Sequence, residues 1–582
     1  MKDEKRKSSG CNVTTTGNED PFCKIMDKAG SSGHFQRMYN GIFILGLSCF
    51  GAMIYMNIIL ALNVPEHWCN VPGREKTNLT LNEWRDLTLP REMDNRKVET
   101  FSKCKMYDRN FTDINVTDIS SDFDASGFGV KECPYGYSYD KTWYERTIPT
   151  QENWVCDKDL YVTNTFVVSR VTEVIGSFVL GQMGDTFGRR VVYYISVILA
   201  TIGRSFSIFS TSSFTMFLIT SSLVALTVNS LFQSPLIVGM EISGEDDRTN
   251  IAMYQSFGWS IGTTLMPLLF WWLRDWVPFM WLTTLPTALV LVFYKYVIES
   301  PRWLISKRRY AEALVQFKTI AHFNGRTFTI TEKELAELYG NLDEEKVFGV
   351  ASLFSGWRIA KNTMIMGFSW CVVAVSYFTL VLFSSRMGGN PFLNFLLQSV
   401  VEIPAYIVGK YLGDKYGRRL TNSMSFLICF VSCIPVVMFA QKPQYEHITT
   451  IIAAFIKFLN AVTFFLVSLQ AMEIYPTCLR QTGIALGTIL CNAIGILAPY
   501  LVHLGTKYDI RYPYFILGAI FLIGGCSGLF LPETLHNKLP DSLEEAKSFG
   551  KNQKFFSLPK PHQPNSEELS ATEKLNQPKF VP

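Results

Sequence analysis

The sequence predicts an all-α membrane protein with twelve transmembrane helices in two six-helix halves. Three observations lead to this prediction: long apolar runs cover most of the chain, a polar segment divides them into two sets of six, and one short motif occurs in each set. The chain has 582 residues, of which 48% are hydrophobic. A soluble chain of this length would usually divide into several domains with separate cores.

The first apolar run, residues 41–62, contains no charged residue. At a rise of about 1.5 Å per residue, it is long enough to cross a hydrocarbon core of about 30 Å. It is too long, and starts too far into the chain, for a cleaved signal peptide. Helices are expected because a span must satisfy its own backbone groups. The other runs are residues 161–182, 191–210, 214–239, 252–273, 278–298, 362–384, 391–412, 421–440, 448–472, 481–504 and 512–531.

Two long hydrophilic segments interrupt these runs. Residues 64–160 contain four cysteines and three glycosylation sequons, which together indicate an oxidising, extracellular environment and two disulfides in one of three pairings. Residues 299–361 carry both signs of charge and contain no sequon. Their pattern of apolar and charged residues predicts amphipathic helices. The cysteines are Cys69, Cys104, Cys133 and Cys156, and the sequon asparagines are Asn78, Asn110 and Asn115.

Basic residues predict the orientation in the plasma membrane. Pairs or triplets of basic residues follow the second and eighth runs, whereas the opposite short loops carry them singly, so both termini are expected in the cytoplasm. The expected organisation is a cytoplasmic N-terminus (1–40), an N-terminal half (41–298) with the extracellular loop (64–160), cytoplasmic linker helices (299–361), a C-terminal half (362–531) and a cytoplasmic tail (532–582). The polar, proline-containing tail is expected to be disordered.

The repeated motif is GDTFGRR at residues 184–190 and GDKYGRR at residues 413–419. Two copies at matching places indicate a duplication with parallel halves, an architecture of transporters that rock around a midplane site. The glycines permit a tight turn. We expect the aspartates to accept backbone N–H groups at a neighbouring helix end and the arginines to pair across a cytoplasmic gate. Asp185 and Asp414 would then hold an outward-facing state.

Further motifs are NVPEHWC before residue 70, NWVCDKDL before the second run, ESPRWL at 299–304, EIYPTCLRQTG at 473–483 and LPETL at 531–535. With the repeated loop motif, they make the chain resemble the major facilitator superfamily, in particular its organic cation, carnitine and organic anion transporters. The resemblance implies movement of organic ions by alternating access without ATP hydrolysis. Gating residues are expected in these motifs, namely Asp185, Arg189, Arg190, Asp414, Arg418, Arg419, Glu299, Arg302, Glu473 and Arg480.

Other function classes find little support. The chain has no G-x-x-x-x-GK-[ST] phosphate loop, and no cofactor or metal is expected. Cys371, Cys491 and the 7 histidines form no recognisable nucleophile–base set, so an enzyme is not expected. The net charge of +4 is too small to argue for nucleic acid. The expected partners are a small organic ion, a coupling ion such as a proton or sodium, and the lipid bilayer.

Charged residues inside spans are candidates for the substrate pathway because each costs about 2.5–3.5 kcal/mol on insertion scales. Arg170 and Glu173 lie three residues apart and share a helix face, as a self-neutralising pair or as part of the pathway. For Arg204 we prefer a structural contact with a neighbouring helix. Glu402 precedes Pro404, which loosens the helix, and the resemblance implies that this carboxylate faces the cavity. Lys457 matches a basic family position and would balance Glu402 or bind an anionic group.

Aromatic side chains complete the candidate site. Trp370 and Tyr377 lie seven residues apart on one helix face and match cavity aromatics of the family, although lipid-facing aromatics are also common. An aromatic face attracts a quaternary ammonium by about 0.5–2 kcal/mol. Tyr254 and Gln255 also match the family pattern. Asn492 is neutral where cation transporters of the family carry aspartate and where anion and carnitine transporters carry arginine.

The intramembrane charges comprise two acids and three bases, a mixture that suits a zwitterion. The sequence therefore predicts transport of small organic cations or zwitterions, such as carnitine-like compounds or amine metabolites. An organic anion transporter that uses Arg170, Arg204 and Lys457 is the alternative, followed by a membrane receptor or adaptor that does not transport.

Overall fold

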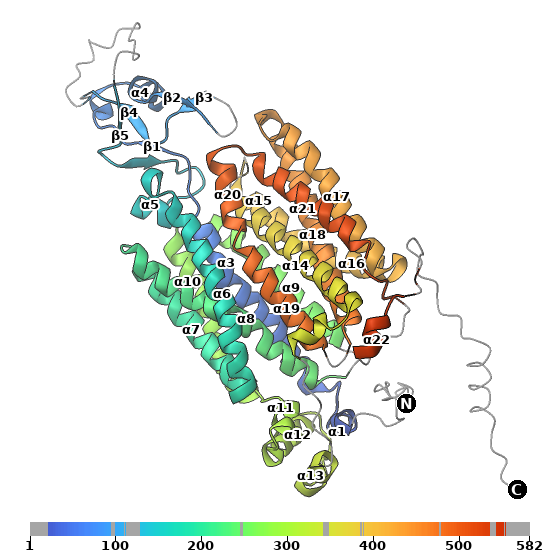
Figure 1. The fold of residues 1–582 in the computed structure, drawn as a ribbon. Coiled ribbons are helices and arrows are strands. Elements are labelled where there is room, and N and C mark those ends of the chain that lie inside the picture. Colours follow the sequence, from blue (N-terminus) through green and yellow to red (C-terminus); the bar gives the residue numbers. More distant parts are fainter. Residues whose placement is uncertain are drawn as a thin grey trace, which may run out of the picture.

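The computed structural model describes residues 21–94, 99–109, 111, 129–244, 248–340, 349–384, 387, 389–476, 479–535, 540, 543–551 and 553. Figure 1 shows a bundle of long helices with a small cap of short strands at one end and several short helices at the other. We call the end that carries residues 64–160 the loop end, and the end that carries residues 299–361 the linker end.

The long helices coincide with the predicted apolar runs. The N-terminal half contains α2 (His34–Tyr39), η1 (Asn40–Gly46) and α3 (Leu47–Ala61) as one span, then α6 (Leu160–Phe187), α7 (Arg189–Phe209), α8 (Phe214–Glu241), α9 (Arg248–Leu273), and α10 (Trp276–Leu289) with η7 (Val290–Tyr296). The C-terminal half contains α14 (Trp357–Ser384), α15 (Pro391–Val400), α16 (Glu402–Tyr416), α17 (Arg418–Phe439), α18 (Glu446–Ile474), α19 (Arg480–Gly495), α20 (Ala498–Lys507) and α21 (Tyr512–Gly528).

Within the described residues, 10 helical segments are long and apolar enough to cross a membrane. The 26-residue α9 and the 17-residue α21 lie at the fifth and twelfth predicted runs. The first span begins at His34 rather than at residue 41, because Phe35 and Tyr39 are buried and extend its apolar face. The predicted membrane fold therefore agrees with the observed helices.

Two spans are broken near a proline. Helix α15 ends at Val400, four residues before Pro404, and α19 ends at Gly495, four residues before Pro499. A proline has no N–H group to bond the carbonyl four residues earlier, so the helix is interrupted there. The first break leaves Glu402 at the start of α16.

The cap contains β-structure that the all-α prediction did not include. Three antiparallel pairs form it: β1 (His67–Cys69) with β6 (Tyr137–Tyr139), β2 (Arg91–Met93) with β3 (Glu99–Phe101), and β4 (Lys105–Tyr107) with β5 (Val130–Glu132). It also holds η2 (Arg74–Lys76), α4 (Leu81–Thr88), α5 (Ile148–Glu152) and η5 (Cys156–Lys158). Because this segment is hydrophilic, hydropathy gave no signal for its strands.

Two disulfides close the cap, Cys69–Cys133 and Cys104–Cys156. Of the three pairings that the sequence left open, the structure adopts this one. The sequon residue Asn78 is exposed on the cap. Asn110 and Asn115 lie outside the described residues.

The linker end carries α11 (Pro301–Ser306), α12 (Tyr310–Phe323), α13 (Glu332–Gly340) and η8 (Val350–Phe354). Helix α1 (Pro21–Ala29) packs on α12, where the ring centroids of Phe22 and Phe317 are 5.9 Å apart. Helix α22 (Leu543–Ser548) packs on the C-terminal half through the buried Ala546. The prediction of a disordered tail was wrong for this helix, because its apolar side chains add to that core.

The buried cores show how the halves meet. At the linker end the N-terminal half has its own core, and a second core lies within the C-terminal half. Near the loop end, a shared core takes residues from both halves. There Phe392 of α15 lies 4.9 Å from Tyr144 and 5.7 Å from Phe270 between ring centroids. The two halves are therefore joined by apolar contacts near the loop end.

Candidate functional site

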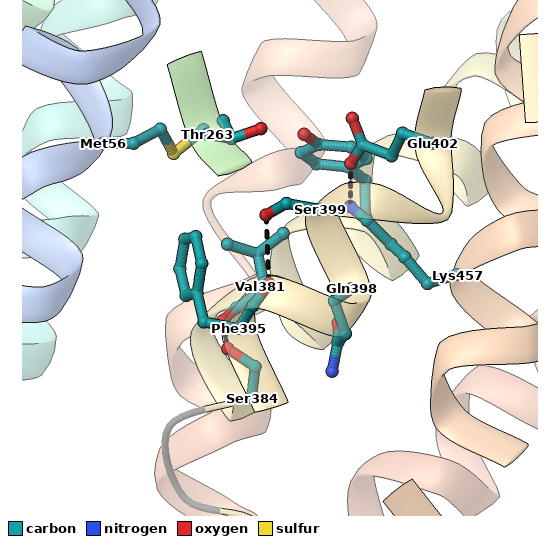
Figure 2. A pocket seen from close by; sticks show the side chains of 10 residues that line it. Met56, Thr263, Val381, Ser384, Phe395, Gln398, Ser399, Glu402 and Lys457 are labelled. Atoms are coloured by element: carbon teal, nitrogen blue, oxygen red, sulfur yellow. Dashed lines mark hydrogen bonds and ion pairs between the residues drawn. The ribbon is translucent and has the colours of Figure 1, made fainter. Parts of the chain in front are cut away.

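A pocket lies between the two halves, and several of the side chains predicted to bind substrate line it. Figure 2 shows Met56 and Thr263 of the N-terminal half on one side of it, and Glu402 with Lys457 of the C-terminal half on the other. The remaining lining residues are Tyr377, Val381, Ser384, Phe395, Gln398 and Ser399. Its volume of about 10 Å³ leaves room for about one water molecule beside these polar groups.

The carboxylate of Glu402 is 1% exposed and binds groups from both halves. Its Oε1 lies 3.0 Å from the Nζ of Lys457 on α18. Its Oε2 accepts a hydrogen bond of 3.2 Å from the hydroxyl of Ser260 on α9. The residue lies in the first turn of α16, directly after the break that ends α15.

The ammonium group of Lys457 is fully buried against an aromatic ring. Its Nζ lies 2.9 Å from the ring centroid of Tyr377, and the residue is 0% exposed. The phenol oxygen of Tyr377 accepts a hydrogen bond of 2.9 Å from the indole of Trp259 on α9. Cation, carboxylate and ring therefore form one cluster across the two halves.

A second buried ion pair also lies where the halves meet. Arg170 Nη1 is 2.8 Å from Glu173 Oε2, which also accepts a 2.7 Å hydrogen bond from the hydroxyl of Tyr55. The guanidinium carbon of Arg170 lies 3.4 Å from the ring centroid of Phe378 on α14. The pair therefore neutralises itself and also faces the other half. Tyr377 and Phe378 are adjacent in α14, and each covers the cation of one ion pair.

Arg204 makes a structural contact. Its Nε and Nη2 lie 3.2 and 2.9 Å from the carbonyl oxygen of Ile54 on α3, and both donate to it. The side chain is 2% exposed. This contact with a neighbouring helix is the structural role preferred from the sequence.

Several predicted residues do not line the pocket. Trp370 packs on Phe464 and against Gly487, about two helical turns from Tyr377, so sharing a face did not place both rings together. Asn492 is buried within α19. Gln255 donates to the carbonyl of Phe232 at 3.1 Å, and Tyr254 is exposed near the start of α9.

The structure adds Tyr55, Trp259, Ser260 and Phe378 to the candidate site. All four are uncharged and lie in apolar runs, so a search for intramembrane charge passes over them. In the sequence they are marked only by a hydroxyl, an indole N–H or an aromatic ring inside an apolar run. Such groups occur in many of the apolar runs of this chain, so they do not single out these four residues.

The repeated loop motif makes the same contacts in both halves. Gly188 and Gly417 have positive φ angles of 102° and 92°. After the first, Glu299 accepts from the backbone N–H groups of Arg189 and Arg190 at 2.8 and 3.1 Å. After the second, Glu533 accepts from the backbone N–H groups that open α17, also at 2.8 and 3.1 Å.

The expectation that the aspartates accept these N–H groups was therefore wrong, because glutamates from distant segments satisfy the unpaired amides of each helix start. The aspartates instead bind arginines of their own motif, Asp185 with Arg189 at 2.8 Å and Asp414 with Arg418 at 3.1 Å. Arg418 also lies 3.3 Å from Glu473. These arginine pairs form within one half, contrary to the pairing expected across the gate.

A second repeat, missed in the sequence, completes this arrangement. Met-Glu-Ile occurs at residues 240–242 and 472–474. Ser300 donates to Glu241 in the N-terminal half, and Thr534 donates to Glu473 at 2.5 Å in the C-terminal half. Three-residue repeats are frequent by chance, so only the matching contacts distinguish this one. Among the other expected gating residues, Arg302 lies over the ring of Phe22, and Arg480 opens α19.

The model of one protein family, described as sugar (and other) transporter, matches residues 124–544, more than half of the chain. The chain belongs to this family. The carcinine transporter of Drosophila melanogaster is 28% identical over 91% of this chain and 80% of that protein. The human organic cation/carnitine transporter 2 is 29% identical over 89% and 92% of the two chains. The Drosophila β-alanine transporter is 26% identical over 90% and 89%.

Solved structures agree on the fold. The E. coli proton:xylose symporter XylE, bound to 6-bromo-6-deoxy-D-glucose, superposes with a TM-score of 0.55 at 14% identity, covering 88% of this chain and 99% of that one. This likeness confirms the major facilitator fold. The matched relatives are membrane transporters rather than enzymes, and they include the organic cation and carnitine transporters that the sequence motifs indicated.

Proposed function

We propose that this protein transports small organic cations or zwitterions, carnitine-like compounds or amine metabolites, across the plasma membrane by alternating access. The observation that carries this proposal is the buried cluster of Glu402, Lys457 and Tyr377 in a pocket between the halves. A carboxylate beside an aromatic face is the environment that an organic ammonium group binds best. The names of the matched carcinine, carnitine and β-alanine transporters support the same substrate class.

The charge balance of the interface favours a zwitterion. Two buried carboxylates are paired with two buried cations, Glu402 with Lys457 and Glu173 with Arg170. A substrate with one charge of each sign adds no net charge to this region, whereas an unpaired buried charge is strongly unfavourable. The proposed core of the binding site is Glu402, Lys457 and Tyr377. The pair Arg170–Glu173 borders it, and Trp370, Tyr254, Gln255 and Asn492 belong to the surrounding walls of the pathway.

Alternating access requires one end of the bundle to open while the other closes. The shared aromatic contacts of Phe392 support a state closed at the loop end. We assign the loop end to the outside, on the basis of its disulfides and sequons, and the linker end with both termini to the cytoplasm. In the opposite state, the Phe392 contacts would separate. The gating residues of the repeated motif would then form new contacts between the halves.

The membrane potential tests the substrate charge. Uptake of carnitine, β-alanine, tetraethylammonium and p-aminohippurate is measured in expressing cells, at rest and after depolarisation with external potassium. A cation gains about 2.3 kcal/mol per 100 mV of inside-negative potential, an anion loses it, and a zwitterion is indifferent. In the absence of sodium, we expect depolarisation to leave the uptake of carnitine or β-alanine unchanged. We expect it to lower the uptake of the cation tetraethylammonium.

Cells without the protein provide the background, and replacing sodium or changing external pH tests for a coupling ion. Uptake of p-aminohippurate alone, rising on depolarisation, would establish the organic anion alternative. No flux of any solute, in cells or in liposomes with purified protein, would contradict transport and favour a receptor or adaptor.

A further inference from the structure

We propose that Lys457 is a built-in substitute for the ammonium group of the substrate, which must displace it, so that the site selects substrates that carry both an ammonium and a carboxylate. This inference rests on the proposed function for the location of the binding site. It adds a specificity-determining role for one residue and restricts the substrate class to zwitterions.

The position of the Lys457 ammonium is the first observation. Its Nζ lies 3.0 Å from Glu402 Oε1 and 2.9 Å from the ring centroid of Tyr377. A carboxylate and a ring face are the two attractions that this pocket offers to an organic cation. Lys457 makes both contacts at once, and it therefore occupies the place that a substrate ammonium would take.

The size of the pocket is the second observation. With about 10 Å³, it holds about one water molecule and no organic ammonium. The Lys457 side chain is fully buried among these lining groups. In this arrangement an ammonium has no room to make the contacts that Lys457 makes with Glu402 and Tyr377. The flexible four-carbon stem of lysine permits the Lys457 ammonium to move aside.

The pocket also provides an acceptor for the displaced lysine. Gln398 lines it, and the side-chain oxygen of this residue is buried without a hydrogen-bond partner among the residues that the structure describes. In Figure 2 the Gln398 side chain lies in the lining of the same pocket, four residues before Glu402, and points away from the present position of the Lys457 ammonium. A buried amide oxygen normally has a donor, so this atom is a suitable new partner for the ammonium.

Charge pairing then decides which substrates bind. When a zwitterion enters, its ammonium binds Glu402 and its carboxylate binds the released Lys457, so every charge keeps a partner. A simple cation leaves Lys457 unpaired, and a simple anion leaves Glu402 unpaired. Burying an unpaired charge is much less favourable than burying a pair. Lys457 thereby turns an acidic, aromatic site into one that selects zwitterions.

The other ion pair is less suited to this exchange. Both carboxylates also accept from a hydroxyl, Glu402 from Ser260 and Glu173 from Tyr55, so the difference lies in the cations. Arg170 is a rigid, planar cation that covers Phe378. Lys457 is the more readily displaced cation of the two.

The test compares choline with carnitine, because both carry a trimethylammonium group and only carnitine carries a carboxylate. Binding to purified protein and uptake by cells are measured for the wild type and for Lys457→Met. We expect choline affinity to rise about tenfold and carnitine affinity to fall about tenfold in the variant. Lys410→Met, at an exposed lysine of the same helix as Glu402, is the matched control and should change neither affinity.

Folding is controlled separately, because Lys457→Met leaves Glu402 without its counter-ion. If the variant is unstable, choline added during purification should restore its yield and raise its melting temperature, whereas carnitine should do so less. Equal rescue by both ligands, or unchanged affinities for both, would overturn the role of Lys457 while leaving transport intact. A wild type that neither binds nor moves any of choline, carnitine, β-alanine and tetraethylammonium would overturn the proposed function, and this inference with it.

Discussion

Replacing Glu402 by glutamine is expected to lower kcat/KM for a carnitine-like substrate by about 100-fold, because removing one partner of a buried charge pair costs about 2–5 kcal/mol. The substrate ammonium loses its counter-charge, and Lys457 is left paired only with the ring of Tyr377. Initial uptake rates at several substrate concentrations, divided by the surface amount from biotinylation, measure this loss.

Two further variants make this result interpretable. Glu402→Asp retains the charge on a shorter side chain and should keep part of the activity. Glu337→Gln removes an exposed carboxylate from α13 and should leave uptake unchanged. Wild-type kinetics in Glu402→Gln would show that this carboxylate does not contact the substrate, and the cavity assignment would fail.

Replacing Glu533 by alanine should remove most of the protein from the cell surface. This carboxylate is 5% exposed and accepts from the backbone N–H groups of Arg418, Arg419, Thr534 and Leu535, at 2.8, 3.1, 3.0 and 3.1 Å. A buried donor left without a partner costs about 1–3 kcal/mol, and the first turn of α17 would lose two acceptors together. Surface biotinylation and the melting temperature of the purified protein measure the effect.

Asp414→Ala is the matched control at the same turn. Its side chain is 50% exposed, and an exposed ion pair such as that with Arg418 contributes about 0–1 kcal/mol. We expect a near-normal surface amount together with slower uptake, as a gating role for this aspartate requires. Equal surface amounts for both variants would show that the contacts of Glu533 do not hold the two segments together.

The sequence was sufficient to predict the membrane fold. Long apolar runs identify spanning helices because a bilayer has a fixed thickness and offers no partners to the backbone. The repeated loop motif identified the two halves, and the comparisons confirm both the fold and the resemblance to organic cation and carnitine transporters. Glu402 and Lys457 were also singled out from the sequence as candidates, since charge inside a span is rare, and the structure places the two side chains 3.0 Å apart.

The expectations that failed depended on which way individual side chains point in the folded protein. The aspartates of the loop motif do not cap the following helices, and the arginines of the motif that they bind pair within one half. The contributions of Tyr55 and Ser260 were missed entirely. Spans that are apolar on most sides have no distinct polar face, so their pattern does not show which side chains point inward.

By itself, the sequence determined which segments cross the membrane, where the chain was duplicated and which residues carry charge inside it. Only the tertiary structure decided the pairing of Cys69 with Cys133, the contact of Glu533 with the start of α17, and the position of Lys457 between Glu402 and Tyr377. Each of these joins residues on separate segments. Hydropathy and spacing report the surroundings of one segment, whereas such contacts depend on how each helix is rotated and packed against the others.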